Sequence, residues 1–161
     1  MSKTIILFYS FEGNTKKIAM YLSEKLKLPY EEIKLKDNFS SKGFSKYLWG
    51  GSQVVMKKKP ELESLKIDLD EYDTVILGSP IWAGSFAPAM RTILEDEIVN
   101  NKNIAFFYCH DGGPGKAENK IKEAIKINNQ LISTYGLSRV KDNYETLKDG
   151  VLNWAKETIA K

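Results

Sequence analysis

A continuous apolar run at residues 4–9 (TIILFY), followed at once by a segment with helical spacing, constrains this chain most. A run without alternation is typical of a strand that is buried on both faces of a parallel sheet. Residues 14–27 then place apolar side chains on one helical face, namely Ile18, Ala19, Leu22 and Leu26. A strand joined to a crossover helix requires a sheet that helices cover.

The same order recurs along the chain. Further strands are predicted at residues 30–35, 74–77, 103–109 and 131–135, and further helices at residues 88–97, 117–128 and 144–159. Strands that alternate with helices imply right-handed crossovers. The sequence therefore predicts a doubly wound α/β fold, with helices on both faces of a five-stranded parallel sheet.

Residues 36–70 are irregular in pattern and are expected to hold the second crossover helix. Their aromatic side chains, which include Phe39, Phe44 and Trp49, either pack in the core or form part of a ligand wall. The sequence leaves that choice open. No internal repeat, low-complexity tract or linker divides the chain, so we expect a single domain over residues 1–161.

Composition excludes several classes of protein. One Cys cannot form an internal disulfide, and one Cys beside one His, Cys109 and His110, is too few for structural zinc. The longest apolar runs are far shorter than the roughly 20 residues that cross a bilayer. The first residues contain no small-residue cleavage site, and we expect a cytoplasmic protein. With 24 basic and 21 acidic residues the net charge is only +3, so we expect no nucleic-acid partner.

The first candidate ligand loop, residues 10–15, follows the first strand. In open α/β sheets, ligands bind beyond the carboxyl ends of the strands. Hydroxyls at Ser10 and Thr15, a glycine at Gly13 and a helix N-terminus are what a phosphate requires. The alternative is an ordinary helix start capped by Asn14 or Thr15. Neither GxxxxGK[ST] nor GxGxxG is present, which disfavours ATP and dinucleotides.

Two more loops are predicted at the same edge of the sheet. Residues 78–85 follow the third strand and carry Trp82, which suits stacking on an aromatic ring. Residues 109–115 follow the fourth strand, and their glycines expose backbone N–H groups. A phosphate site, a stacking Trp and a rim of backbone donors together indicate a planar aromatic ligand with a phosphate tail.

These residues resemble the flavodoxin superfamily, whose phosphate loop reads hydroxyl, any residue, hydroxyl, Gly, Asn, Thr. Ser10, Gly13, Asn14 and Thr15 match that loop, and the similarity covers nearly the whole chain. The resemblance implies strand order 2-1-3-4-5 and non-covalently bound FMN. It implies that the flavin lies between two further sets of residues: Ser79, Pro80, Ile81, Trp82, Ala83 and Gly84 on one side, and Cys109, His110, Asp111, Gly112 and Gly113 on the other.

The chain departs from the family pattern at two places. Glu12 stands where the family has Ser or Thr, so we expect its backbone N–H to bind phosphate while its side chain points to water. Residues 109–115 lack the Tyr or Trp that covers the outer flavin face in many flavodoxins. That face is then open, or it is covered by an aromatic of residues 36–70.

Cys109 and His110 are adjacent, but neighbouring residues on an extended chain point apart, which disfavours a nucleophile pair. Cys109 is interpreted as a small buried residue. His110 is interpreted as a loop side chain near the polar edge of the flavin.

Two functions of different class fit the sequence. One is a flavodoxin-type carrier of electrons between partner proteins, and the alternative is an FMN-dependent reductase that uses NAD(P)H and a quinone or similar acceptor. A sequence pI of 8.8 departs from the strongly acidic character of typical flavodoxins. The sequence shows no recognisable site for the phosphates of NADH or NADPH, which disfavours the reductase. We favour the redox protein that transfers electrons through bound FMN.

Overall fold

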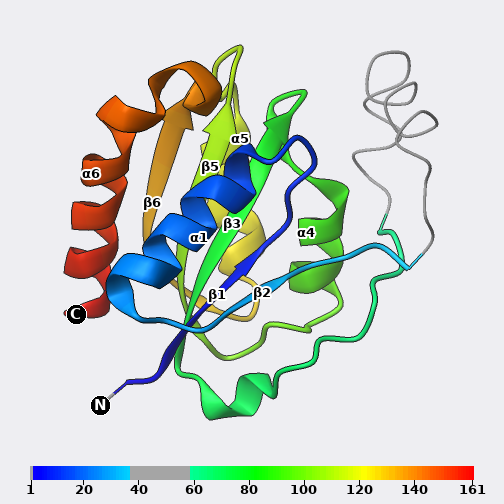
Figure 1. Ribbon diagram of the computed structural model, residues 1–161. Coiled ribbons are helices and arrows are strands. Elements are labelled where there is room, and N and C mark those ends of the chain that lie inside the picture. Colours follow the sequence, from blue (N-terminus) through cyan, green and yellow to red (C-terminus); the bar gives the residue numbers. More distant parts are fainter. Residues whose placement is uncertain (1, 37–58) are drawn as a thin grey trace.

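The structure, a computed structural model, describes residues 2–36 and 59–161. Its sheet has the order β2-β1-β3-β5-β6, and the short β4 pairs with β3 off this path (Figure 1). The strands are β1 (Thr4–Phe8), β2 (Tyr30–Glu32), β3 (Thr74–Trp82), β4 (Ser85–Phe86), β5 (Asn103–His110) and β6 (Gln130–Ser138). The five strands of the path pair in parallel in the predicted order. The antiparallel β4 was not predicted.

Helices cover both faces of the sheet (Figure 1). They are α1 (Asn14–Leu26), α4 (Pro88–Glu95), α5 (Ala117–Ile125), α6 (Val140–Ile159) and the short 3-10 helix η1 (Leu69–Glu71). Buried residues of α1 and α6 pack on one face, and those of α4 and α5 pack on the other. Most of the predicted second crossover, with Phe39, Phe44 and Trp49, lies outside the described residues.

Several predicted bounds were too short. The ladder between β3 and β5 continues to the Pro80–Cys109 pair, so residues 78–82 belong to a strand and not to a loop. The predicted strand 103–109 likewise continues by one residue, because β5 ends at His110. Pairing with a neighbouring strand supplies hydrogen bonds that hold Gly and Pro in extended chain, which local sequence does not reveal.

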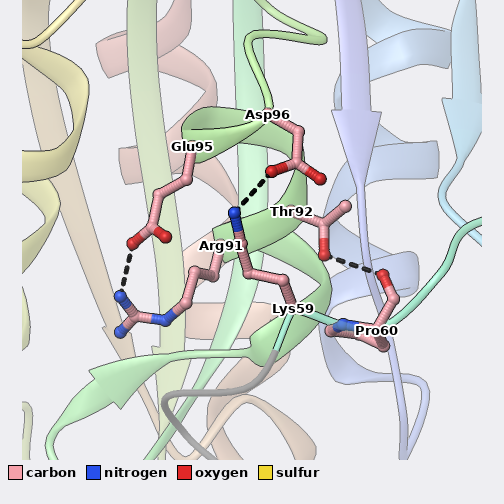
Figure 2. A network of polar contacts seen from close by, with 6 residues as sticks. All are labelled: Lys59, Pro60, Arg91, Thr92, Glu95 and Asp96. Carbon is pink, nitrogen blue, oxygen red and sulfur yellow. Dashed lines mark hydrogen bonds and ion pairs between the residues drawn. The ribbon is translucent and has the colours of Figure 1, made fainter.

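The first described residues after the gap are held against α4 by polar contacts (Figure 2). Lys59 Nζ lies 2.7 Å from Asp96 Oδ1, and the hydroxyl of Thr92 donates to the carbonyl of Pro60 at 2.8 Å. Arg91 pairs with Glu95 one turn along the same helix at 2.6 Å. The contacts of Lys59 and Pro60 hold these two residues beside α4, on the face of the sheet that α4 and α5 share.

Trp154 on the last helix is partly buried and packs against the sheet. Its ring packs against the cluster under α1 and α6, and its Nε1–H donates to Ser133 Oγ at 2.9 Å. Among residues 2–36 and 59–161, no helix combines the length and the apolar character needed to cross a membrane.

Replacing Gly78 with Ala tests the central ladder. A Cβ at position 78 would overlap the ring of Phe107, whose Cε1 would lie 2.6 Å away. Overpacking of this kind costs about 1 to 3 kcal/mol. We expect Gly78→Ala to lower the free energy of unfolding in urea by that amount. In the double variant with Phe107→Leu the combined loss should be smaller than the sum of the single losses, and simple additivity would contradict the contact.

Candidate functional site

Three chain segments meet at the carboxyl ends of β1, β3 and β5 and line one cavity of about 270 Å³. The described residues that line it are Ser10, Phe11, Glu12, Asn14, Thr15, Pro80, Ile81, Trp82, Ala83, Cys109, His110, Asp111 and Gly112. The three segments that the sequence singled out therefore converge. Phe11 is an addition that sequence reasoning missed. The lining set does not include four predicted residues: Gly13, Ser79, Gly84 and Gly113.

The first segment ends in a helix start whose N-cap residue is a glycine and supplies no side-chain cap. Gly13 is the residue before α1 and adopts a left-handed conformation (φ 101°), and the first turn carries no acidic residue. The expected alternative, a cap by Asn14 or Thr15, is therefore wrong, because both lie inside the helix. The hydroxyl of Ser10 accepts the N–H of Lys16 at 3.2 Å. That bond occupies one N–H group of the first turn, and a helix start presents further N–H groups and a partial positive charge.

Thr15 lies in this first turn, and its side chain is 1% exposed. Its hydroxyl oxygen is buried and has no hydrogen-bond partner among the described residues. The thiol of Cys109, a weak hydrogen-bonding group, is the neighbour that interacts with it. A buried hydroxyl without a strong partner costs free energy, so its place on the cavity wall indicates a polar ligand atom.

Cys109 is a buried neutral thiol, as interpreted from the sequence. Burial raises its pKa to about 12, the nearby Asp111 carboxylate acts in the same direction, and contact with Thr15 opposes them. The thiolate is the reactive form of cysteine. At neutral pH this thiol is therefore inert, which agrees with the sequence argument against covalent catalysis.

The second segment is the end of β3 and a two-residue turn into β4. Trp82 pairs with Ser85 across the turn, and both Ala83 (φ 48°) and Gly84 (φ 69°) are left-handed, as a type I′ hairpin requires. Ser79 serves the scaffold, since its buried hydroxyl accepts the N–H of Ala87 at 3.0 Å.

Two aromatic rings from the β1 side meet the indole of Trp82 edge to face. The Tyr9 ring lies 5.9 Å from it at 89°, and the Phe11 ring lies 5.6 Å from it at 90°, measured between ring centroids. Tyr9 is itself held in the sheet, because its N–H donates to the carbonyl of Gly78 at 3.0 Å. Burial raises the pKa of the Tyr9 hydroxyl to about 12. Trp82 therefore lies on the cavity wall with two aromatic rings packed against its indole.

The third segment begins at the end of β5. His110 Nδ1 is buried without a hydrogen-bond partner among the described residues. Burial lowers the pKa of His110 from its ordinary 6.5, while the neighbouring Asp111 carboxylate acts in the opposite direction. The imidazole is therefore neutral at pH 7. Beyond it, Gly112 and Gly113 have open space where a Cβ would lie, so the backbone there is accessible to a ligand.

The cavity thus combines an anion-binding helix start, an aromatic and aliphatic wall, and a glycine-rich rim. Within the described ranges 2–36 and 59–161, no group of three or more His, Cys, Asp and Glu side chains is placed to hold a metal ion. The arrangement can bind a planar ring system that carries an anionic tail.

Comparison with known proteins gives the same family from two directions. A family model described as Flavodoxin matches residues 3–154. A flavoprotein from Lactobacillus acidophilus, crystallised in complex with FMN, is 26% identical with a TM-score of 0.66, and the match covers 92% of this chain and 98% of that one. No curated protein matches significantly.

Two further solved structures share the fold. One from Bacteroides uniformis superposes with a TM-score of 0.77 at 21% identity, covering 96% of this chain and 98% of that one. Oxidised flavodoxin 2 from Bacillus cereus superposes with a TM-score of 0.58 at 18% identity, covering 97% of this chain and 99% of that one.

The chain has one histidine, so the pKa of His110 can be measured without overlap from other imidazoles. Because burial lowers the His110 pKa, the folded protein holds fewer protons than the unfolded chain between that pKa and 6.5. Stability should therefore rise with pH through this window and level off above it. An NMR titration should show one imidazole with a midpoint below 6.5, and the chain in urea should show the ordinary value. A folded-state midpoint at or above 6.5 would contradict the burial.

Proposed function

The chain belongs to the flavodoxin family, and from this premise we propose that it binds FMN without a covalent bond and transfers electrons through it. The observation that carries the proposal is the buried hydroxyl of Thr15, which has no strong hydrogen-bond partner among the described residues, at the start of α1. A similar flavoprotein, that of Lactobacillus acidophilus, was crystallised with FMN. FMN, when bound, supplies the reversible uptake and release of one or two electrons.

The first segment fits the phosphate of FMN. Ser10 and Thr15 would supply hydroxyls, and the backbone of Glu12, Gly13 and Asn14 would supply N–H groups at a helix start that favours negative charge. Gly13 has open space where a Cβ would lie, which leaves room for close approach to its backbone. Glu12 is exposed, so its carboxylate can turn toward water.

The other two segments fit the ring. Pro80, Ile81 and Trp82 would supply an apolar and aromatic surface, and the Ala83–Gly84 turn would face the edge of the ring. Cys109 and His110 would close the opposite side, and the backbone of Asp111, Gly112 and Gly113 would supply hydrogen-bond donors. The neutral imidazole of His110 can exchange a hydrogen bond with a ring carbonyl without adding charge to the site.

The carrier and the reductase differ in what must reach the ring. A carrier needs partner proteins that dock on the cavity edge, and a net charge of +3 suits acidic partners. The reductase needs space for NADH or NADPH and for a quinone. Residues 111–113 favour such access, since one aspartate and two glycines place no aromatic side chain over the cavity. We propose the carrier and keep the reductase as the alternative.

Two buried threonines provide a matched test of FMN placement. Thr4 and Thr15 both have hydroxyls that are buried and unpartnered among the described residues, but Thr4 opens β1 at the opposite end of the strand. A hydrogen bond to a charged group contributes about 1.5 to 3 kcal/mol. Thr15→Ala should therefore weaken FMN binding roughly 10- to 100-fold by fluorescence titration. Thr4→Ala should leave the dissociation constant unchanged, and equal effects would refute the placement of the phosphate.

A potentiometric titration without oxygen separates the two roles. A one-electron carrier should take up its two electrons at well separated potentials. A reductase should take up both together, and NADH or NADPH alone should bleach its colour within seconds. Bleaching by a nicotinamide with a single two-electron step would overturn the carrier, and failure of the protein to bind FMN at all would overturn both roles.

A further inference from the structure

We propose that β6 (Gln130–Ser138) is a self-association surface, through which two copies of this chain pair edge to edge, antiparallel, and join their sheets. Among the described strands, β6 pairs only with β5, so it ends the sheet on that side (Figure 1). The inference goes beyond the proposed function, because it concerns the edge of the sheet and not the cavity.

The outer side of β6 presents backbone groups that no described strand meets. The N–H of Arg139, the residue after β6, donates to the carbonyl of His110 at 2.8 Å. Residues of a strand in a parallel ladder bond alternately to one side and to the other. Tyr135, four residues before Arg139, therefore also bonds toward β5. The N–H and C=O groups of Thr134 and Gly136 point away from β5, and Gly136 is exposed.

The two edges of the sheet differ in how they are protected against such pairing. Short strands, charged side chains and prolines usually protect an edge. β2, at the opposite edge, is three residues long and contains Glu31 and Glu32. β6 is nine residues long and contains neither a charged residue nor a proline. Its register with β5 shifts at Ile132, and residues 133–138 beyond the shift pair regularly.

The charges beside this edge favour a second copy over a charged partner. Glu118 of α5 accepts the hydroxyl of Thr134 at 3.2 Å and is itself paired with Lys122 at 2.8 Å. The edge therefore carries no excess charge of one sign, and two copies can meet there without repulsion. Most homodimers have a two-fold axis, across which the same surface meets itself.

The outward backbone groups define the register of the pair. With the two-fold axis at Tyr135, Thr134 of each copy lies opposite Gly136 of the other, and these residues exchange N–H···O=C bonds on both sides of the axis. The two Tyr135 side chains then form a pair without backbone bonds, in which side chains come closest. Each Tyr135 ring already packs on Trp154, 5.6 Å between centroids, so the contact joins two aromatic pairs.

This arrangement leaves both cavities open. In an antiparallel pair the carboxyl ends of the strands point in opposite directions, so the two cavities lie at opposite ends of the joined sheet. None of the described residues that line the cavity belongs to β6. The affinity for FMN should therefore be the same with and without the pairing.

Sedimentation equilibrium of the full chain from about 1 μM to 1 mM tests the pairing. We expect the mass to rise with concentration from 18.3 kDa toward twice that value. Thr134→Pro removes the outward N–H and leaves the ladder to β5 intact, so the dissociation constant of the dimer should rise about tenfold or more. Thr134→Val keeps that N–H but loses the hydroxyl bond to Glu118, and it should retain the dimer.

A matched pair of lysine variants gives a second test. Ile132→Lys adds a charge to the half-buried edge of β6 and should weaken the dimer. Tyr30→Lys adds the same charge to β2, where the side chain is 44% exposed, and should have no effect. Circular dichroism and the urea midpoint establish that each variant is folded. If Thr134→Pro does not fold, Ile132→Lys carries the test.

Hydrogen exchange locates the contact without a mutation. The amides of Thr134 and Gly136 should exchange more slowly as the concentration of the protein rises. The amide of Arg139, which is already bonded to His110, should exchange at a rate independent of concentration.

The outcomes separate this inference from the proposed function. A mass that stays at 18.3 kDa up to 1 mM would overturn the pairing, as would a dimer that persists unchanged in Thr134→Pro and Ile132→Lys. A protein that remains monomeric, but whose Thr134 and Gly136 amides become protected when an extended peptide of another sequence is added, would overturn the second copy as the partner. Failure to bind FMN with the dimer intact would overturn the proposed function alone.

Discussion

The parallel pairing of β3 with β5 and with β1 brings the three segments that line the cavity to one edge of the sheet. The register of β3 with β5 runs from the Thr74–Asn103 pair to the Pro80–Cys109 pair, and β1 pairs along the other side of β3 as far as Gly78. Because the three strands run in the same direction, the segments that follow them leave the sheet at one edge. The anion-binding helix start, the aromatic wall and the glycine-rich rim owe their proximity to this pairing.

The ladder reaches that edge because of small residues in β3. Gly78 has no Cβ, which leaves room for the ring of Phe107 on the neighbouring strand. Ser79 donates its hydroxyl hydrogen to the carbonyl of Pro80 at 2.9 Å and accepts the N–H of Ala87, so the chain stays hydrogen-bonded beside a proline that has no N–H. Gly78 and Ser79 thus allow β3 to continue as a strand to Trp82, its last residue.

Long apolar runs and helical stripes were sufficient to predict the α/β class and the alternation of strands and helices. The spacing of apolar residues within one segment already shows which of its faces are buried. Residues 78–82 could not be recognised as strand, since Gly and Pro favour turns unless a partner strand holds them extended. The position of Ser79 depends on the same pairing. Phe11 was missed for a related reason, because an aromatic inside a Gly/Asn loop has no periodicity and its contact with Trp82 joins segments distant in sequence.

A buried polar atom without a hydrogen-bond partner does not by itself mark a ligand site. The groups that lie next to the atom decide whether it does. Four buried side-chain atoms lack partners in residues 2–36 and 59–161: Thr4 Oγ1, Thr15 Oγ1, Ser85 Oγ and His110 Nδ1. Each costs about 1 to 3 kcal/mol, so an unpaired atom is kept where something offsets it. Thr4 shows that such an atom alone does not make a site. Thr15 differs because it lies in the first turn of a helix whose N-cap is a glycine, and His110 because open glycine backbone follows it. A neutral thiol and a neutral imidazole also line the cavity. If the proposed function holds, the attraction for the anionic tail would therefore come from the helix start, and the attraction for the ring from Trp82.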